Sequence, residues 1–283
     1  MNDFCAFILT NGRPDRVYTY KTLKKCGYSG RIILLVDNLD KTKDEYVRIY
    51  GKEVVIFDKE EIAKTFDQGD NFNDMRAIIY ARNASFKVAK DLGIKWFIQL
   101  DDDYQRFEHR YTSDLDYFPP TRLVRNLDGV FASMRKFMES TNCSSIAMAQ
   151  GGDFIGGRKS PMASSVKLKR KAMNSFLCTT EREFKFIGRV NEDVNTYTRQ
   201  ASTGLLLFTT NQVSLVQKAT QSNKGGMTEL YLDSGTYLKS FYSVMFHPSG
   251  VKVSVMHANH KRIHHLIQWK HTTPMILRES LRK

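Results

Sequence analysis

The first hundred residues alternate short apolar runs with longer segments of helical pattern. The apolar runs are Phe4–Thr10, Arg31–Val36, Glu53–Phe57 and Lys95–Leu100, and the helical segments are Val17–Cys26, Lys43–Tyr50 and Asn73–Leu92. A strand that is apolar throughout is buried on both faces, which happens when helices cover both sides of a parallel sheet. The alternation therefore predicts an α/β fold with a mostly parallel central sheet flanked by helices.

The second half of the chain has a less regular pattern. We expect a polar connection over residues 104–126, a helix over Leu123–Glu139, and a strand over Ser145–Ala149 that runs into glycine pairs at 151–152 and 156–157. Short apolar runs separated by glycine-rich turns follow, and the last of them is Val251–Met256. Because no repeat or low-complexity linker divides the chain, we expect one domain over residues 1–283, with a smaller mixed region in its C-terminal half.

The net charge of +13 is concentrated in the second half of the chain. Residues 101–283 contain 26 Lys and Arg against 16 Asp and Glu, whereas residues 1–100 contain 17 against 14. The stretches with the largest surplus are Gly157–Arg189 and Lys239–Lys283. Localised positive charge fits a polyanionic partner such as nucleic acid, because each neutralised phosphate releases counterions. A solubilising basic face is the alternative interpretation.

Three features indicate a cytoplasmic protein. No run of apolar residues is long enough for a membrane span. The N-terminus, Met1-Asn2-Asp3-Phe4, lacks the basic and apolar regions of a signal peptide. The four cysteines are scattered along the chain without metal-ligand spacing, which is typical of reduced thiols.

Polar residues stand where the predicted strands end. They are Thr10, Asn11, Arg13, Asp37 and the run Asp101-Asp102-Asp103, which we call the acidic triplet. Parallel sheets bind ligands at the carboxyl ends of their strands. Three adjacent carboxylates repel one another, and a hard divalent cation offsets this repulsion while also binding nucleotide phosphates. A solvated acidic loop or the start of a helix is the alternative for the triplet alone.

The second acidic site is Asn191-Glu192-Asp193, which we call the acidic turn. A carboxylate in a partly desolvated pocket can remove the proton from an attacking hydroxyl group. The same residues suit the N-terminus of a helix, where Asn191 would cap the helix and the acidic residues would offset its macrodipole. The two interpretations are compatible.

Histidines and arginines supply further candidates. Six of the seven histidines fall between residues 247 and 271. His257 follows a predicted strand and could complete a coordination sphere that carboxylates begin. The spacing of His260 and His264 would place both on one helical face. Arg76 and Arg82 precede the acidic triplet in a predicted helix and suit a diphosphate site, with a solvated helix face as the alternative.

The segment Gln217–Pro248 interleaves glycine, aromatic and basic residues. Such a composition on flexible backbone suits contact with the bases and the backbone of a nucleic acid. Ordinary turns between strands are the alternative for this segment.

The order of these features resembles the core of the GT-A glycosyltransferases, whose sheet is Rossmann-like. The residues that carry the resemblance are Thr10-Asn11-Gly12-Arg13-Pro14, Ala81-Arg82-Asn83, the acidic triplet, the glycine pairs, the acidic turn and His257. A later set, Gly188–Tyr197 with Thr220-Gln221, Gly225–Thr228 and Gly235–Phe241, is similar to the TET-associated glycosyltransferases of phages. The resemblance spans roughly residues 4–260.

The GT-A resemblance implies roles for individual residues. Asp101 and Asp103 would flank a Mn²⁺ or Mg²⁺ ion and the donor diphosphate, with His257 as a further metal ligand. Asp193 would be the catalytic base, with Glu192 beside it. The residues that it places near the nucleotide are Thr10, Asn11, Arg13 and Asp37, to which we add Arg76, Arg82 and Asp102 as candidate donor contacts. Gly151-Gly152 would lie near the acceptor or the donor sugar.

The phage-family resemblance implies transfer of a sugar, from a UDP-sugar, to 5-hydroxymethylcytosine in double-stranded DNA in the cytoplasm of the bacterial host. Residues 1–103 would form the half that binds the nucleotide-sugar. Residues 104–283 would form the acceptor half and end in a basic tail.

Three other functions fit part of the pattern. A GT-A enzyme that glycosylates a saccharide or a lipid-linked acceptor would have the same acidic residues. A non-catalytic DNA-binding protein on an α/β scaffold would have the same basic surplus. A nucleotidyltransferase would also use a metal held by carboxylates.

Overall fold

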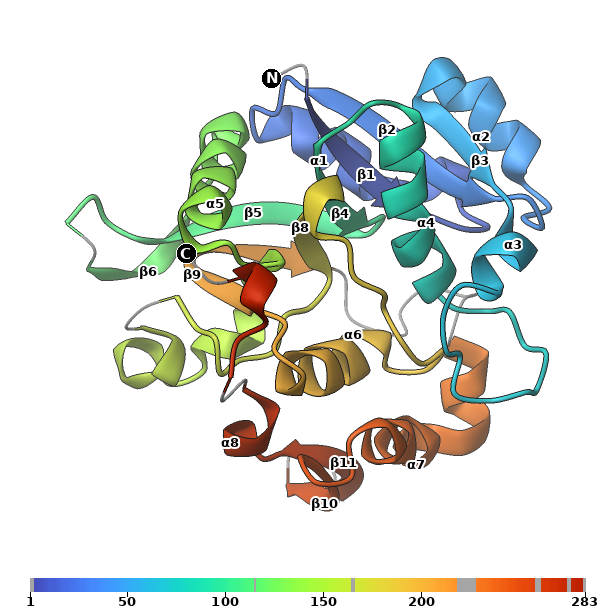
Figure 1. Ribbon diagram of the computed structural model, residues 1–283. Helices are drawn as coiled ribbons and strands as arrows, with labels where there is room; N and C mark the ends of the chain where they lie inside the picture. The colour runs from blue at the N-terminus through green and yellow to red at the C-terminus, as the bar shows by residue number, and fades with distance from the viewer. Residues whose placement is uncertain are drawn as a thin grey trace.

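The computed structural model describes residues 3–114, 116–163, 166–217, 228–257, 261–273 and 276–281, without the side chains at 118–120, 228–236, 257 and 281. Its centre is a nine-stranded sheet in the order β3-β2-β1-β4-β8-β7-β9-β5-β6 (Figure 1). The strands are β1 Phe4–Leu9, β2 Arg31–Asp37, β3 Val54–Phe57, β4 Trp96–Asp101, β5 Tyr104–Tyr111, β6 Tyr117–Leu123, β7 Ser145–Gln150, β8 Ser175–Thr179 and β9 Leu207–Gln217.

Strands β3, β2, β1 and β4 are parallel to one another, and helices pack on both faces of this half of the sheet. The helices of the first part of the chain are α1 Tyr18–Lys25, α2 Lys43–Tyr50, α3 Lys59–Ala63, α4 Ile79–Asp91 and α5 Leu127–Thr141. Strand β1 is buried at every position, because its side chains alternate between two cores. Phe4 stacks on Phe131 of α5, whereas Phe7 contacts Phe97, which in turn contacts Phe86 of α4. The predicted α/β fold is confirmed.

The rest of the chain forms a smaller layer below the sheet (Figure 1). Its elements are α6 Glu192–Asn195, which continues as a π-helical turn over Thr196–Gln200, then α7 Thr228–Phe246, β10 Val251–His257, β11 Lys261–Ile267 and α8 Trp269–Thr272. Strands β10 and β11 form an antiparallel hairpin that packs against α7. Trp269 of α8 stacks on Tyr197 with ring centroids 5.8 Å apart, and this contact joins α8 to the helical turns after the acidic turn.

Single helical turns complete the chain. They are η1 Pro14–Arg16, η2 Gly51–Glu53, η3 Gly151–Phe154, η4 Gly157–Lys159, η5 Pro161–Ala163, η6 Thr180–Arg182 and η8 Glu279–Leu281.

Residues 104–126 are not the polar connection that the sequence predicts. They form strands β5 and β6, and β6 is an edge of the sheet. Tyr104 and Phe107 are buried, whereas the residues between them, Gln105 and Arg106, are exposed. The prediction was wrong because strands near the open end of a sheet keep polar residues on their solvated positions, so they lack the apolar run that marks a central strand.

The segment Gln217–Pro248 is not a series of turns in the part that the structure describes. Residues 228–246 form helix α7, and its buried residues Ser240 and Ser243, with the buried His247 just after its end, recur at helical spacing. The sequence motifs at 220–221 and 225–227 lie outside the described residues. His264 lies in strand β11, so its predicted position on a helical face is wrong, and His260 lies outside the described residues.

Helix α4 begins at Ile79, six residues later than predicted, because Asn73 has a φ of 56° and residues 74–78 are not helical. Helix α5 begins at Leu127, where Asn126 Oδ1 accepts a hydrogen bond from Gly129 N and caps the helix. Both starts depend on local turn geometry that the apolar pattern does not record.

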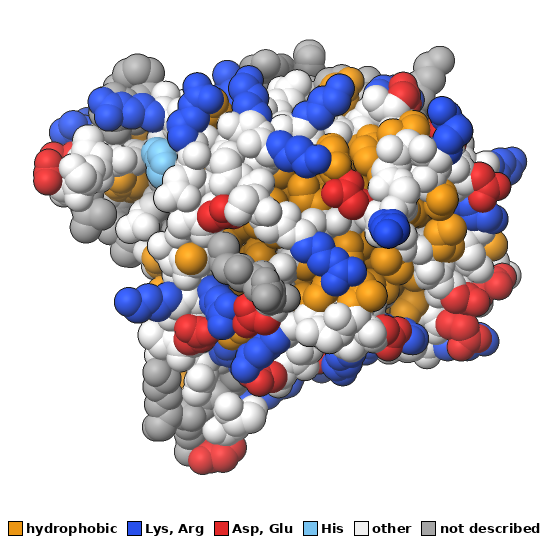
Figure 2. All heavy atoms as spheres, turned by 90° about the horizontal axis from the view of Figure 1, so that it is seen from above, with side chains coloured by type: hydrophobic (Ala, Val, Ile, Leu, Met, Phe, Trp, Pro, Cys, Tyr) orange, Lys and Arg blue, Asp and Glu red, His pale blue; other side chains and the backbone are white. Residues whose placement is uncertain are grey.

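The upper end of the molecule, away from α7 and the hairpin, carries both positive and negative side chains. Figure 2 shows that Lys and Arg, Asp and Glu, and apolar side chains are mixed across it. The basic surplus of the chain is therefore not gathered on this face.

Candidate active site

The polar residues at the ends of three parallel strands meet at one edge of the sheet. Thr10 follows β1, Asp37 ends β2 and Asp101 ends β4. Because β1 pairs in parallel with both β2 and β4, their carboxyl ends face the same side of the molecule. The sequence predicted this convergence correctly for these three positions.

The middle carboxylate of the acidic triplet turns inward. Asp102 is only 2% exposed, and its Oδ2 accepts a hydrogen bond of 2.7 Å from Thr10 Oγ1. Its Oδ1 lies 3.2 Å from the guanidinium of Arg13. Thr10 Oγ1 also lies 2.8 Å from the hydroxyl of Tyr46, which accepts a hydrogen bond from Arg13 N. Asp102 therefore holds the loop after β1 in place, whereas the sequence suggested it as a donor contact.

A second polar cluster joins the ends of β1, β2 and β3. Asn11 Nδ2 donates to Asp37 Oδ2 at 2.8 Å, and Lys59 Nζ lies 3.2 Å from the same oxygen. Asp40 Oδ2 accepts from Gly12 N at 2.7 Å, at a glycine whose φ is +68°. Lys59 was not predicted from the sequence, although its position two residues after β3 gave the same strand-end signal as Asp37.

Arg82 joins the acidic triplet to the acidic turn. Its Nη2 donates to Asp101 Oδ1 and its Nε donates to Glu192 Oε1, each at 3.0 Å. The residue is 1% exposed, and its guanidinium carbon lies 5.1 Å from the ring centroid of Phe176. Because its own atoms are covered, Arg82 acts on the site through the two carboxylates that it orients.

The charge at this junction is unbalanced. One buried guanidinium contacts two carboxylates, and the rest of the acidic triplet lies beside them. Burial raises the pKa of Asp101 to about 7; Arg82 lowers this pKa, whereas Asp103 and Glu192 raise it. Burial, followed by the charge of Asp193, also raises the pKa of Glu192. A cation bound here would lower the free energy of the ionised carboxylates.

The acidic turn opens the short helix α6. Asp193 is 6% exposed, and its Oδ1 accepts a hydrogen bond of 2.7 Å from Val194 N. This geometry agrees with the helix N-terminus that the sequence suggested, because the carboxylate offsets unpaired amides of the first turn. Glu192 of this turn is joined to Asp101 of the acidic triplet through Arg82.

The sequence predicts that the side chain of Asn191 caps α6, but in the structure this side chain makes no capping hydrogen bond. Asn191 adopts a left-handed backbone conformation with a φ of 63° and a ψ of 37°. Its Nδ2 donates to Ser243 Oγ at 2.8 Å and lies 3.3 Å from the carbonyl oxygen of Lys239, both in α7. The same nitrogen lies 3.3 Å from His265 Nδ1 in β11. Elements of the C-terminal layer therefore fix the residue that precedes Glu192.

A buried arginine supports the chain before the acidic turn. Arg189 is 2% exposed and lies 2.8 Å from Asp70 and 3.2 Å from Asp74. Arg76 pairs with the same Asp74 on an exposed turn at 3.0 Å, and this contact is the main cause that lowers the pKa of Asp74. From the sequence, Arg189 was only one residue of a basic stretch, and its buried ion pairs with Asp70 and Asp74 were not predicted.

Asp101 and Asp103 remain the candidate metal ligands. Within the described ranges, no group of three or more His, Cys, Asp or Glu residues lies close enough to hold a metal ion. His257 is the last residue of β10, at the strand end where the sequence placed it, and its side chain lies outside the described residues. Two carboxylates suffice where substrate phosphates supply further ligands to the ion.

Comparison with known proteins identifies the family. The profile of one family, described as TET-Associated Glycosyltransferase, matches residues 4–226. The chain belongs to this family. It is a glycosyltransferase, as the sequence resemblance implied. No curated protein sequence matches the chain.

Solved structures of glycosyltransferases are similar to this family member at low identity. Glucosyl-3-phosphoglycerate synthase from Mycobacterium tuberculosis, in complex with Mn²⁺, UDP and phosphoglyceric acid, is 9% identical with a TM-score of 0.45 over 94% of this chain and 87% of its own. The mannosyltransferase PcManGT from Pyrobaculum calidifontis, in complex with GDP-Man and Mn²⁺, is 11% identical with a TM-score of 0.45 over 86% of this chain and 72% of its own.

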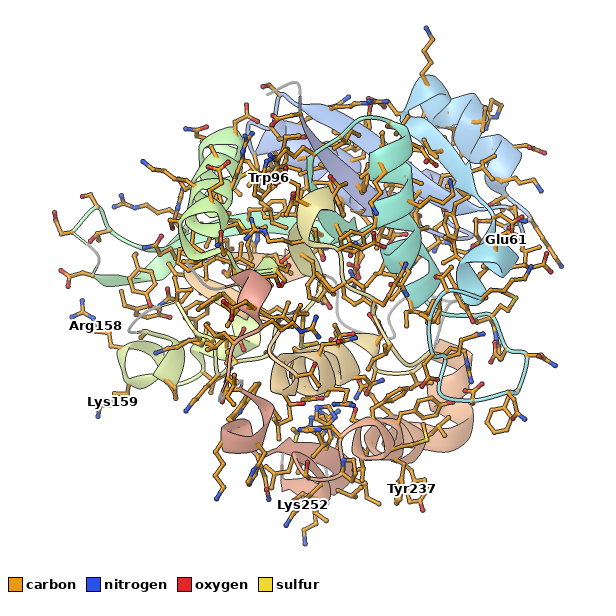
Figure 3. All side chains as sticks on the ribbon, viewed as in Figure 1. Glu61, Trp96, Arg158, Lys159, Tyr237 and Lys252 are labelled. Carbon is orange, nitrogen blue, oxygen red and sulfur yellow. The ribbon has the colours of Figure 1, made fainter. Side chains whose placement is uncertain are left out.

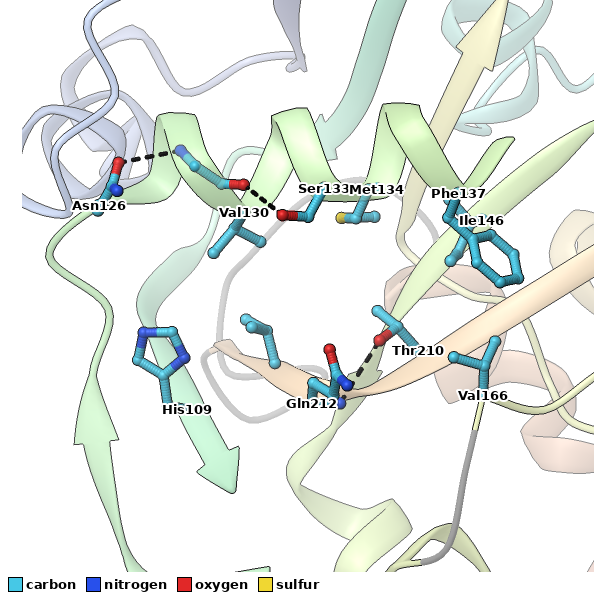
Figure 4. A pocket seen from close by; sticks show the side chains of 12 residues that line it. His109, Asn126, Val130, Ser133, Met134, Phe137, Ile146, Val166, Thr210 and Gln212 are labelled. Carbon is cyan, nitrogen blue, oxygen red and sulfur yellow. Dashed lines mark hydrogen bonds between the residues drawn. The ribbon is translucent and has the colours of Figure 1, made fainter. Parts of the chain in front are cut away.

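The glycosyltransferase also has a cavity of about 630 Å³ on the face of the sheet that α5 covers. Figure 4 shows it between α5, which contributes Val130 and Phe137, and β5 and β9, which contribute His109 and Gln212. Burial lowers the pKa of His109. None of the acidic residues described above lines this cavity. Among the described residues, no helix has the length and apolar character required to span a bilayer.

Proposed function

We propose that this glycosyltransferase moves a sugar from a UDP-sugar to the hydroxymethyl group of 5-hydroxymethylcytosine in double-stranded DNA, with Mn²⁺ or Mg²⁺ as cofactor. The observation that carries the proposal is the bridge from Asp101 through Arg82 to Glu192, which gathers the acidic triplet and the acidic turn into one site. The family resemblance and the basic second half of the chain support DNA as the acceptor, in the cytoplasm of a bacterium infected by a phage.

The residues at the end of β4 fit a hard divalent cation. The Asp101 side chain keeps 21% of its surface exposed, although Arg82 occupies its Oδ1. Asp103 lies two residues further along the turn, and carboxylate oxygens are the ligands that Mg²⁺ and Mn²⁺ prefer. We assign Asp101 and Asp103 as the metal ligands and His257 as a third. When bound, the ion would stabilise the negative charge of the departing UDP.

The acidic turn would supply the base for the transfer. The hydroxymethyl oxygen of the acceptor attacks the anomeric carbon of the sugar, so that a new carbon–oxygen bond forms. The bond between that carbon and the diphosphate oxygen breaks, and UDP leaves with the bonding electrons. Asp193 would receive the hydroxyl proton, and Glu192 beside it would remain paired with Arg82.

The two halves of the chain would divide the substrates between them. Residues 1–103 would bind the nucleotide-sugar through Thr10, Asn11, Arg13 and Asp37, and residues 104–283 would bind DNA. Basic side chains suited to phosphate contact project from the second half, as Figure 3 shows for Arg158, Lys159 and Lys252. Arg170 and Lys171 belong to the same basic stretch but pair with the buried Asp153, so they contribute less to the surface charge.

Mass spectrometry of modified DNA tests the proposal. A duplex with 5-hydroxymethylcytosine, incubated with Mn²⁺ and a panel of UDP-sugars, is expected to gain the mass of one sugar per modified base. The matched duplex with unmodified cytosine lacks the attacking hydroxyl group and is expected to gain none. If no donor modifies the duplex while a free saccharide is glycosylated, the DNA acceptor is wrong and the saccharide acceptor takes its place.

A further inference from the structure

The turn between η3 and η4 presents an isoleucine to solvent. Ile155 is 82% exposed, the largest fraction of any large apolar side chain in the part of the chain that the structure describes. Its neighbours Asp153 and Phe154 are buried, at 4% and 5% exposure. The isoleucine therefore projects from a folded turn, and we refer to residues 153–159 as the glycine loop.

The base of the glycine loop is held by several contacts. Asp153 pairs with Arg170 and Lys171, and its Oδ2 accepts a hydrogen bond of 2.9 Å from Gln150 N. Phe154 stacks on Tyr117 with ring centroids 5.8 Å apart and an interplanar angle of 22°. The guanidinium carbon of Arg110 lies 4.6 Å from the centre of the Phe154 ring. These contacts hold in place the two residues that directly precede Ile155.

The glycine loop lies at the same edge of the sheet as the acidic triplet. Strands β4 and β7 both pair antiparallel with β8, so they run in the same direction. Their carboxyl ends are two strand spacings apart, which is about 10 Å. The pKa of the buried Tyr197 is raised by burial first and then by Asp193, is lowered by Arg170, and is raised by Asp153 of the loop.

The residues that follow Ile155 suit the backbone of a nucleic acid. Gly156 and Gly157 have φ values of +97° and +57°, and neither carries a side chain that would block close approach. Arg158 and Lys159 are exposed, and both point away from the body of the protein in Figure 3. A cationic, glycine-containing loop with one apolar tip therefore stands at the same edge of the sheet as the acidic triplet.

We propose that Ile155 is a wedge that enters the base stack of duplex DNA and occupies the space left by the target nucleotide. This inference rests on the proposed DNA acceptor. A base must leave the stack to reach groups inside a protein, as the largely buried Asp193 would require. Proteins that unstack a duplex use exposed Ile, Leu, Met or Phe side chains for this purpose, while nearby cations hold the phosphates.

Replacement of Ile155 by alanine tests the wedge. The variant is expected to lose roughly tenfold or more in kcat/KM on a duplex with 5-hydroxymethylcytosine, because the unstacking cost is no longer offset. On a single strand of the same sequence, the target base does not have to leave a duplex. The rate of the variant on this substrate is expected to stay within about twofold of the wild-type rate. A 2-aminopurine beside the target base is expected to brighten when the wild type binds the duplex, and less so with I155A.

Two further variants sharpen the result. Ile155→Phe keeps an apolar tip and is expected to retain most of the activity on duplex DNA. Ile276→Ala removes another isoleucine, which is 76% exposed. This variant is expected to keep the wild-type rate on both the duplex and the single strand. Equal activity of I155A and the wild type on the duplex, or equal losses on both substrates, overturns the wedge while the proposed function stands. If the wild type glycosylates neither form of DNA, the proposed function itself fails and the wedge fails with it.

Discussion

The side-chain nitrogen of Asn191 lies 2.8 Å from Ser243 Oγ, and this contact joins the acidic turn to helix α7. The family match covers residues 4–226, so Ser243 lies beyond the matched residues. The left-handed backbone at Asn191 sets the direction in which Glu192 and Asp193 leave the preceding segment. The C-terminal layer therefore contributes to the geometry of the proposed active site.

Asn191→Gly keeps the left-handed backbone but removes the amide that Ser243 and His265 contact. We expect kcat to fall roughly tenfold and the free energy of unfolding to fall by about 1–2 kcal/mol. Asn191→Ala also strains the backbone and is expected to cost about 1–2 kcal/mol more. Urea unfolding and steady-state kinetics measure both effects. Ser243→Ala should reproduce the glycine variant, whereas Ser85→Ala, in the buried part of α4, should leave kcat unchanged.

Removal of the guanidinium between Asp101 and Glu192 is expected to be severe. Arg82→Met leaves two carboxylates without their buried partner, which should lower the free energy of unfolding by about 3–5 kcal/mol and abolish transfer. Arg135 is the matched control, because it also pairs with two carboxylates, Asp3 and Glu139, on a more exposed surface. Arg135→Met should cost less than about 1 kcal/mol. Similar costs for the two variants would contradict the central role of Arg82.

The two acidic residues of the turn are expected to behave differently. Asp193→Asn removes the proposed base and should lower kcat by about 10²- to 10⁴-fold while UDP binding, measured by calorimetry, stays near the wild-type value. Glu192→Gln keeps the hydrogen bond with Arg82 and should cause a smaller loss. A larger loss in E192Q than in D193N would reverse the assignment of the base.

Removal of the metal should distinguish the roles of the carboxylates in the acidic triplet. EDTA is expected to abolish transfer, and added Mn²⁺ or Mg²⁺ should restore it. Asp103→Asn should raise the concentration of metal needed for half-maximal activity. Asp102→Asn should leave that concentration unchanged and lower the free energy of unfolding by about 1–3 kcal/mol, because Asp102 binds Thr10 and Arg13. Full activity in EDTA would rule out the metal.

His265 makes stability depend on pH. Burial and then the charges of His264 and Lys239 lower its pKa from 6.5 to about 3, and its Nδ1 lies beside the donating amide of Asn191. The unfolded chain binds a proton below pH 6.5, whereas the folded chain does not until about pH 3. Its stabilising contribution is therefore complete above pH 6.5 and declines as the pH falls, by up to about 1.4 kcal/mol per pH unit. Urea unfolding at several pH values measures this slope.

His265→Gln should flatten the acid side of that stability profile. The exposed His271 provides the control, since His271→Gln removes a histidine of the same C-terminal layer without disturbing Asn191. An unchanged slope in H265Q would show that another group causes the loss of stability in acid.

The sequence by itself determined the parallel half of the sheet and the edge at which the polar strand-end residues gather. Strands such as Phe4–Leu9 are apolar at every position because both of their faces are buried, and that property is visible in the residues alone. The same pattern placed Thr10, Asp37 and Asp101 at strand ends. Strands β5 and β6 and helix α7 escaped prediction because they keep solvated positions or contain glycine and polar residues, which weaken a periodic signal.

Only the tertiary structure decided what each polar residue does. Asp101 and Asp102 are neighbours in the chain, yet one meets Arg82 and the other meets Thr10, 92 residues away. Arg82 in turn finds Glu192 at a separation of 110 residues. A carboxylate at a strand end turns toward whichever buried donor can satisfy it, because an unpaired buried charge is costly. That donor comes from another segment of the fold, so local sequence patterns identify the polar residue without identifying its partner.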